Sequence, residues 1–148
     1  MMETKREVST LLPYYIKDGQ VFVYLQKRYS GARILPGHFS FFGGKLEPGE
    51  NITQALEREI KEELGIALKE YTFLGTYQSG VTKEVILHVH FLKVDDNFEK
   101  EVTVMEGEYG KFFSPKEVAD EVLLIDSDKN IIKDLYQLVN NKKRYTNI

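Results

Sequence analysis

The side chains best suited to chemistry are four charged residues that lie close together in the sequence: Arg58, Glu59, Glu62 and Glu63. In an α-helix the three glutamates would be surface neighbours, because side chains three and four residues apart share one face. Each like-charged pair at this spacing costs about 0.2–0.5 kcal/mol. A hard divalent cation would offset that cost, since carboxylate oxygens are the ligands that Mg²⁺ prefers. A glutamate run by itself is more often a solvated helix face, so its surroundings must decide between the two interpretations.

The sequence around these residues predicts the helix that they require. Asn51 is a good N-cap, and Gln54 stands where the partner side chain of a capping box belongs. Gly65 follows the last expected helical residue, where a left-handed C-cap favours glycine. Apolar residues recur every four positions, at Ile52, Leu56, Ile60 and Leu64. We therefore expect a helix over residues 51–64 that packs through this apolar stripe.

The remaining segments predict a β-sheet covered by helices. Strand-like segments lie at residues 8–16, 21–25, 39–42, 71–77, 85–94 and 109–113. Asp18-Gly19 separates the first two and predicts a hairpin, because such a turn needs positive φ at its central residues. Ser114-Pro115 predicts the start of a short helix, and a last amphipathic helix is expected over about residues 127–140. This order of elements indicates an α/β or α+β fold with a mixed sheet.

Composition limits the class of protein. The chain has 148 residues, 42% of them hydrophobic, which suits a single domain over residues 1–148. Cysteine is absent, which excludes a disulfide framework, a thiolate metal site and a cysteine nucleophile. The N-terminus lacks the apolar core of a signal peptide, so a cytoplasmic location without membrane association is expected. A net charge of −3 argues against a stable nucleic-acid complex, although a metal ion could still recruit a polyanionic small molecule.

The acidic run is part of a longer pattern. Gly44 is followed after five residues by Glu50, and after seven more by Arg58-Glu59-Ile60-Lys61-Glu62-Glu63-Leu64-Gly65-Ile66. Residues 44–66 resemble the Nudix box, G-x5-E-x7-R-E-U-x-E-E-x-G-U with U aliphatic, at every specified position. The chain thus resembles the MutT-like Nudix hydrolases. The resemblance extends in organisation over most of the chain, with a hairpin before the box and strands and a terminal helix after it.

The resemblance implies a fold, a reaction and a cofactor. The fold would be an α/β/α sandwich in which a mixed sheet carries the box as a loop and a helix. The reaction would be hydrolysis of a phosphoanhydride bond in a nucleoside diphosphate linked to another moiety, with a nucleoside triphosphate or its oxidised form as one option. Mg²⁺ is the expected cofactor, with Mn²⁺ as an alternative. Homodimers are common in this family, so the resemblance also allows a homodimer.

The same resemblance implies the roles of the charged residues on the helix. Glu59, Glu62 and Glu63 would coordinate the metal ion. Glu59 or Glu62 would accept the proton of the attacking water. Arg58, the other member of the catalytic set, would pair with a glutamate and hold it in place rather than touch the substrate.

Further roles follow for residues outside the helix face. Many Nudix enzymes take another acidic ligand from a loop after the box, where this sequence offers Glu106 or Glu108; Glu108 is preferred here. Gly44 would turn the loop and bring backbone close to the substrate phosphates. Gly65 would end the helix, and Glu50 would support the metal site or the geometry of the loop.

The substrate is less well determined by the sequence. Phe42-Gly43-Gly44-Lys45 departs from the commoner P-G-G and is similar to the F-G-G-K of some hydrolases of oxidised purine nucleoside triphosphates. By that analogy Phe39 and Phe41 would lie near the base, although phenylalanines in a short strand are more often core residues. Arg28 and Lys45 flank the expected cleft and could receive phosphates, or they could be ordinary surface charges.

Other functions of a Nudix-like chain remain open. A nucleotide-sugar or ADP-ribose pyrophosphatase is one, although ADP-ribose hydrolases tend to have a proline downstream of the box, where this sequence reads Gly80-Val81-Thr82. A non-catalytic ligand-binding sensor or regulator is another, although such domains usually lose a box acid and none is lost here. A Nudix-fold isomerase is disfavoured, because its expected catalytic cysteine is absent.

Overall fold

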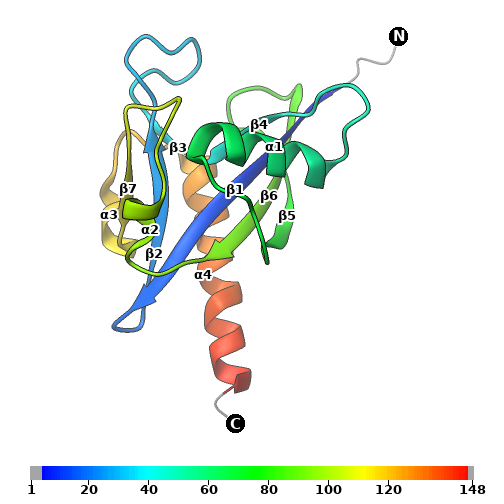
Figure 1. The fold of residues 1–148 in the computed structure, drawn as a ribbon. Coiled ribbons are helices and arrows are strands. Elements are labelled where there is room, and N and C mark those ends of the chain that lie inside the picture. The colour runs from blue at the N-terminus through cyan, green and yellow to red at the C-terminus, as the bar shows by residue number, and fades with distance from the viewer. Residues whose placement is uncertain (1–4, 147–148) are drawn as a thin grey trace.

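The computed structural model describes residues 5–146 of the 148-residue chain, with side chains as far as residue 141. Figure 1 shows the arrangement of its elements. In chain order they are β1 (Arg6–Lys17), β2 (Gln20–Lys27), β3 (Phe39–Ser40), β4 (Phe42–Lys45), α1 (Ile52–Leu64), β5 (Thr72–Gln78), β6 (Val85–Lys93), α2 (Phe98–Glu101), β7 (Tyr109–Phe113), α3 (Pro115–Asp120) and α4 (Asp126–Thr146). None of the helices in this described part is both long and apolar enough to cross a membrane.

The long strand β1 is the centre of a mixed sheet. The main strand order is β3-β2-β1-β6-β5. β1 pairs antiparallel with β4 through residues 8–11 and with β2 through residues 14–17, and it pairs parallel with β6. β7 pairs antiparallel with β2. The register Ser9↔Gly44 fixes the strand that leads into α1 directly against β1.

Helices α1 and α4 cover opposite faces of this sheet (Figure 1). Consecutive strand residues point to opposite faces, so Leu11 enters the core beneath α1 and Leu12 enters the core beneath α4. The α1 core also contains Tyr24, Phe42, Leu56, Ile60 and Leu64, and the α4 core contains Val23, Leu25, Phe113, Ile132 and Leu135. The predicted sandwich of helices around a mixed sheet is confirmed.

The helix of the box begins and ends where the sequence predicts. The Asn51 side chain accepts a hydrogen bond from the Gln54 backbone N–H at 2.8 Å, and the Gln54 side chain accepts one from the Asn51 N–H at 3.0 Å. Gly65 closes the helix in the left-handed conformation, with φ of 72°. Because both ends are capped by local residues, the positions of the glutamates on α1 are set by nearby sequence.

Three details differ from the sequence-based expectation. Residues 39–42 form two strands, because β3 pairs with β2 whereas β4 pairs with β1. The short helix α2 was not expected, since four residues carry too little periodicity to be recognised. Helix α4 continues to Thr146, beyond the expected end near residue 140. The predicted hairpin is confirmed, with positive φ at both Asp18 and Gly19.

Asp128, in the first turn of α4, is buried, and no residue of the described chain donates a hydrogen bond to its carboxylate. Burial raises the pKa of this group from 3.8 to about 6, because the charged form loses solvation. Below pH 4 the carboxyl group is protonated in both the folded and the unfolded state, and its burial has no charge cost. As pH rises from 4 through 6 the group ionises more readily in the unfolded state, so the folded protein loses stability.

We therefore expect Asp128→Asn to remove a pH dependence of stability. In the wild-type protein, the shift corresponds to roughly 3 kcal/mol lost between about pH 4 and pH 6.5. Urea unfolding of both proteins across that range measures the difference between them. A difference in unfolding free energy that stays constant from pH 4 to pH 7 would contradict the expectation.

Candidate active site

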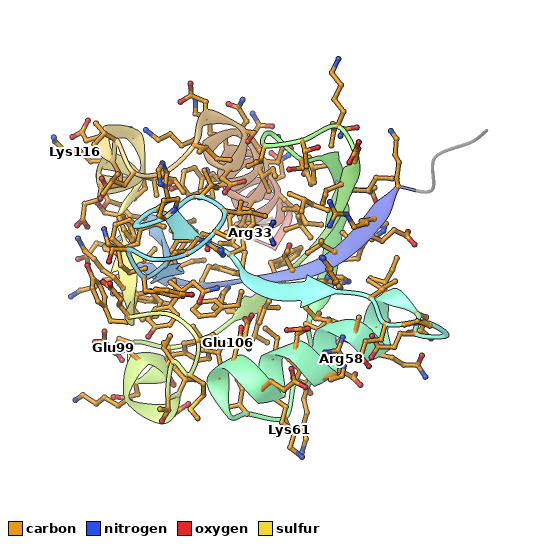
Figure 2. All side chains as sticks on the ribbon, turned by 90° about the horizontal axis from the view of Figure 1, so that it is seen from above. Arg33, Arg58, Lys61, Glu99, Glu106 and Lys116 are labelled. Carbon is orange, nitrogen blue, oxygen red and sulfur yellow. The ribbon has the colours of Figure 1, made fainter. Side chains whose placement is uncertain are left out.

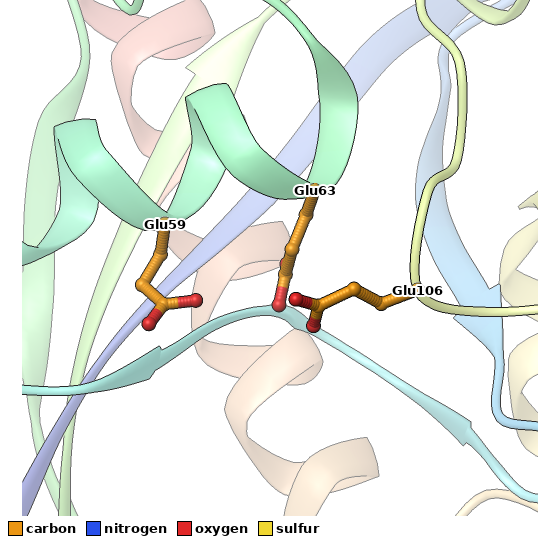
Figure 3. Close-up of side chains that lie close together, drawn as sticks. All are labelled: Glu59, Glu63 and Glu106. Carbon is orange, nitrogen blue, oxygen red and sulfur yellow. The ribbon is translucent and has the colours of Figure 1, made fainter.

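Three carboxylates from two separate parts of the chain meet beside β4. Glu59 and Glu63 come from α1, and Glu106 comes from the loop between α2 and β7 (Figure 3). One oxygen of each lies within 4.8 Å of an oxygen of the other two, and together they form a group that could hold a metal ion. We call these three residues the carboxylate cluster.

Glu63 is the buried member of the cluster, with 3% of its surface exposed. Its Oε2 accepts a hydrogen bond from the Gly43 backbone N–H at 2.8 Å. Burial raises the pKa of Glu63 to about 8, with the negative charges of Glu106 and Glu59 adding to the shift and the Gly43 hydrogen bond opposing it. A cation beside Glu63 would stabilise the ionised carboxylate that metal coordination requires.

Glu59 lies against the backbone of β4. A Cβ atom on Gly44 would overlap the Glu59 carboxyl carbon and lie 2.6 Å from each of its oxygens. Glycine at this position therefore makes room for the carboxylate, rather than serving a special backbone conformation. Burial raises the pKa of Glu59, while the hydrogen bond from Arg58 opposes that rise.

Arg58 ties the loop of the box to the carboxylate cluster. Its Nε donates to Glu50 Oε2 at 2.7 Å and its Nη2 to Glu50 Oε1 at 2.9 Å, which makes a bidentate pair. Nη2 also donates to the Lys45 carbonyl at 2.9 Å, and Nη1 donates to Glu59 Oε1 at 2.8 Å. Hydrogen bonding to Arg58 lowers the pKa of Glu50 to about 2. Figure 2 shows Arg58 on α1 and Glu106 beside the same helix.

Two of the expected acidic residues lie outside the carboxylate cluster. The side chain of Glu62 is 54% exposed, and its Oε2 lies 3.6 Å from Arg58 Nη1. Glu108 uses its backbone N–H to bond the Lys27 carbonyl at 2.8 Å, next to the start of β7. Of the two loop glutamates, the structure brings Glu106 to α1, whereas the sequence favoured Glu108. The position of a loop residue relative to α1 depends on long-range packing, which no local sequence signal reports.

A cleft of about 200 Å³ opens beside the carboxylate cluster. It is lined by Gln26, Arg28, Tyr29, Ala32, Phe41, Gly43, Glu63, Glu106 and Gly107. Arg28 is held by a hydrogen bond of 2.7 Å from its Nε to the Ile34 carbonyl, which leaves its terminal nitrogens available to a ligand. Among these residues the sequence predicts Arg28, Phe41, Glu63 and Glu106 as candidate contacts of substrate or metal, whereas Gln26, Tyr29 and Gly107 are candidate ligand contacts that it does not predict.

The other expected substrate contacts lie elsewhere. Phe39 is buried in the α4 core, where its ring packs edge-on against Phe113 at 4.7 Å between centroids. Lys45 lines a separate groove with Lys5 and Arg6 on the far side of the box loop. Phe41 is buried in the same core, but unlike Phe39 it also lines the cleft.

Comparisons with known proteins agree with this architecture. A family model described as "NUDIX domain" matches residues 5–136. "Nucleoside triphosphatase NudI" of Escherichia fergusonii is 32% identical over 138 residues, which cover 85% of this chain and 95% of that protein. "Putative 8-oxo-dGTP diphosphatase YtkD" of Bacillus subtilis is 32% identical over 94 residues, which cover 60% of this chain and 59% of that protein.

The same fold occurs in solved structures. The crystal structure of a mutT/nudix family protein from Listeria innocua superposes with a TM-score of 0.78 at 18% identity, covering 97% of this chain and 99% of that one. Nudix hydrolases generally use a divalent metal ion and act on small nucleotide substrates. The family match, the relative that aligns over most of both chains and the shared fold together show that this chain belongs to the Nudix hydrolase family.

Proposed function

We propose that this protein hydrolyses a phosphoanhydride bond of a nucleoside triphosphate and releases a nucleoside monophosphate and pyrophosphate. The observation that carries the proposal is the carboxylate cluster at the edge of the cleft, with oxygens of Glu59, Glu63 and Glu106 within 4.8 Å of one another. The names of the Escherichia fergusonii and Bacillus subtilis relatives support a nucleoside triphosphate as the substrate class.

The carboxylate cluster suits Mg²⁺, with Mn²⁺ as the alternative. Both are hard ions that bind carboxylate oxygens, and these three residues offer oxygens close enough to share one ion. Glu63 is buried and forms no ion pair with a described residue, so a cation there would stabilise the ionised form that burial disfavours. When bound, the ion supplies neutralisation of the phosphate oxygens and acidification of the attacking water.

The protein's own side chains then position the reactants. Arg28 faces the cleft and is available to bind phosphate oxygens. Arg58 donates a hydrogen bond to Glu59 and holds that carboxylate in place, while Glu50 fixes the position of the Arg58 guanidinium. Glu62 is exposed, lies outside the carboxylate cluster and has one oxygen 3.6 Å from Arg58 Nη1; its carboxylate accepts the proton of the attacking water, a role for which Glu59 is the alternative.

A substrate panel with two matched variants tests this proposal. The panel holds the common nucleoside triphosphates, 8-oxo-dGTP, a nucleotide sugar, ADP-ribose and a dinucleoside polyphosphate, each with Mg²⁺, Mn²⁺ or EDTA. We expect metal-dependent release of pyrophosphate from a nucleoside triphosphate. Removing a residue that hydrogen-bonds a metal ligand lowers metal affinity or activity by roughly 10–100-fold. Glu63→Gln removes a ligand itself, so its loss of turnover and of metal affinity should be larger. Glu62→Gln should lose turnover but keep the metal affinity that calorimetry measures.

The Glu63→Gln protein should fold normally, because a glutamine can still accept the Gly43 hydrogen bond without burying a charge. Folded wild-type protein that binds metal but turns over no compound of the panel would refute the enzymatic proposal and favour a sensor domain.

The two loop glutamates offer a second test that depends on the geometry. Glu106 belongs to the carboxylate cluster and Glu108 does not, so Glu106→Gln should weaken Mg²⁺ binding and turnover by about tenfold or more, while Glu108→Gln should change both by less than about twofold. Titration of each variant with Mg²⁺ in an activity assay measures the effect. The reverse order of the two variants would show that Glu108 is the loop ligand.

The contact between Gly44 and Glu59 gives a third prediction. Gly44→Ala places a methyl group on the Glu59 carboxylate, and this flexible side chain must move to make room. Displacing a catalytic group by about 1 Å can cost about a hundredfold in rate, so we expect a loss of that order in kcat/KM. The melting temperature should change little, because the added atom meets a flexible side chain and no other element. A variant with full activity would show that Glu59 does not need its observed position.

A further inference from the structure

Gln26 is a buried polar residue whose amide orientation is fixed. It lies in β2, is only 6% exposed and lines the cleft. Its side-chain nitrogen donates a hydrogen bond to the Phe41 carbonyl oxygen at 3.0 Å. Exchanging the amide oxygen and nitrogen would bring two carbonyl oxygens into contact, so the nitrogen must face Phe41. The amide oxygen is therefore directed away from Phe41.

The amide oxygen of Gln26 accepts no hydrogen bond from a described residue. It is not one of the fully buried atoms without a partner, so solvent in the cleft reaches it. Gly107 lies beside it, and a Cβ on Gly107 would be 2.9 Å from this oxygen and 2.8 Å from the Lys27 carbonyl oxygen. The backbone of Gly107 is not left-handed, so glycine is needed there for space rather than for conformation. The missing side chain keeps the Gln26 oxygen accessible from the cleft.

A ligand that donates a hydrogen bond would satisfy this oxygen. A ligand that fills the cleft displaces water from this oxygen, and an O–H or N–H group of the ligand replaces the hydrogen bond that the water supplied. Phosphate oxygens cannot supply such a group, because they are negatively charged and act as acceptors. In a nucleotide the donors are the ribose hydroxyls and the N–H groups of the base. The chemistry of Gln26 therefore fits the nucleoside part of a nucleotide.

We propose that Gln26 is a specificity-determining residue that binds the nucleoside part of the substrate by accepting a hydrogen bond. This binding orients the nucleotide in the cleft, with its phosphates at Arg28 and the carboxylate cluster and its nucleoside at Gln26 and Phe41. The inference rests on the proposed function for the identity of the substrate, but the binding that it describes can be measured without turnover.

The test compares the two products of the proposed reaction as ligands. Gln26→Met keeps the length of the side chain and removes the acceptor, together with the hydrogen bond that the amide nitrogen donates to the Phe41 carbonyl. With Mg²⁺ present, calorimetry measures the Kd of each common nucleoside monophosphate, its 2′-deoxy counterpart and pyrophosphate. We expect Gln26→Met to raise the Kd of the best-bound monophosphate about tenfold, which is the effect of one hydrogen bond. The Kd of pyrophosphate should not change. Gln137→Met, at an exposed position on α4, is the matched control and should change neither Kd.

A second variant protects the test against misfolding of the first. Gly107→Ala leaves the Gln26 side chain unchanged and crowds both its oxygen and the Lys27 carbonyl oxygen, so it should weaken binding of the monophosphate more than binding of pyrophosphate. A wild-type preference for the ribonucleotide over the 2′-deoxynucleotide that disappears in Gln26→Met would identify the 2′-hydroxyl as the donor. An unchanged preference would identify the 3′-hydroxyl or the base.

Three outcomes would overturn the inference: equal weakening of both products, no change in either, or a wild-type protein that binds no monophosphate. Equal weakening would place Gln26 in the metal and phosphate site. The two proposals can also fail separately. If the wild-type protein hydrolyses no substrate but binds a monophosphate, and Gln26→Met weakens that binding alone, the inference is supported and the proposed reaction is refuted.

Discussion

The close approach of α1 to β4 is the constraint on which the rest of the site depends. Gly44 allows this approach, and Gly43, the residue before it, allows β4 to lie equally close to β1. At Gly43 a Cβ would overlap the Ser9 carbonyl oxygen of β1 and lie 2.7 Å from the Thr10 Cα, whereas at Gly44 it would meet the Glu59 carboxylate. Because neither glycine has a side chain, the Gly43 N–H donates a hydrogen bond to Glu63 and the Glu59 carboxylate packs against the backbone of Gly44. The same two residues therefore determine how the sheet packs and where its carboxylates lie.

Charge within the site is compensated unevenly. Arg58 is shared by Glu50 and Glu59, which keeps the box loop and the helix together. Glu63 and Glu106 form no ion pair with any residue in the described part of the chain, and Glu63 is nevertheless buried. Ionising Glu63 in the folded protein is therefore costly, and a bound cation would relieve that cost. Cation binding and folding stability are expected to be linked for this reason.

The sequence predicted those parts that depend on local rules and missed those that depend on distant contacts. The ends of α1 follow from Asn51, Gln54 and Gly65, whose capping bonds are formed within a few residues. The choice of Glu106 over Glu108 depends on how a loop after α2 approaches α1. The open acceptor of Gln26 depends on the Phe41 carbonyl and on Gly107, neither of which is close to it in sequence. Periodicity and spacing carry no information about such long-range contacts.

The parallel pairing of β1 with β6 has a consequence for how the chain acquires its site. Residues 6–14 must find residues 85–93, and Glu106 follows later still. Contacts between such distant segments form slowly, because closing a long loop is entropically costly. On the ribosome, the box would emerge and its capped helix could form long before the third carboxylate is synthesised. A nascent chain that already displays the full family motif would therefore still lack the carboxylate cluster, which arises only when the later loop docks on α1.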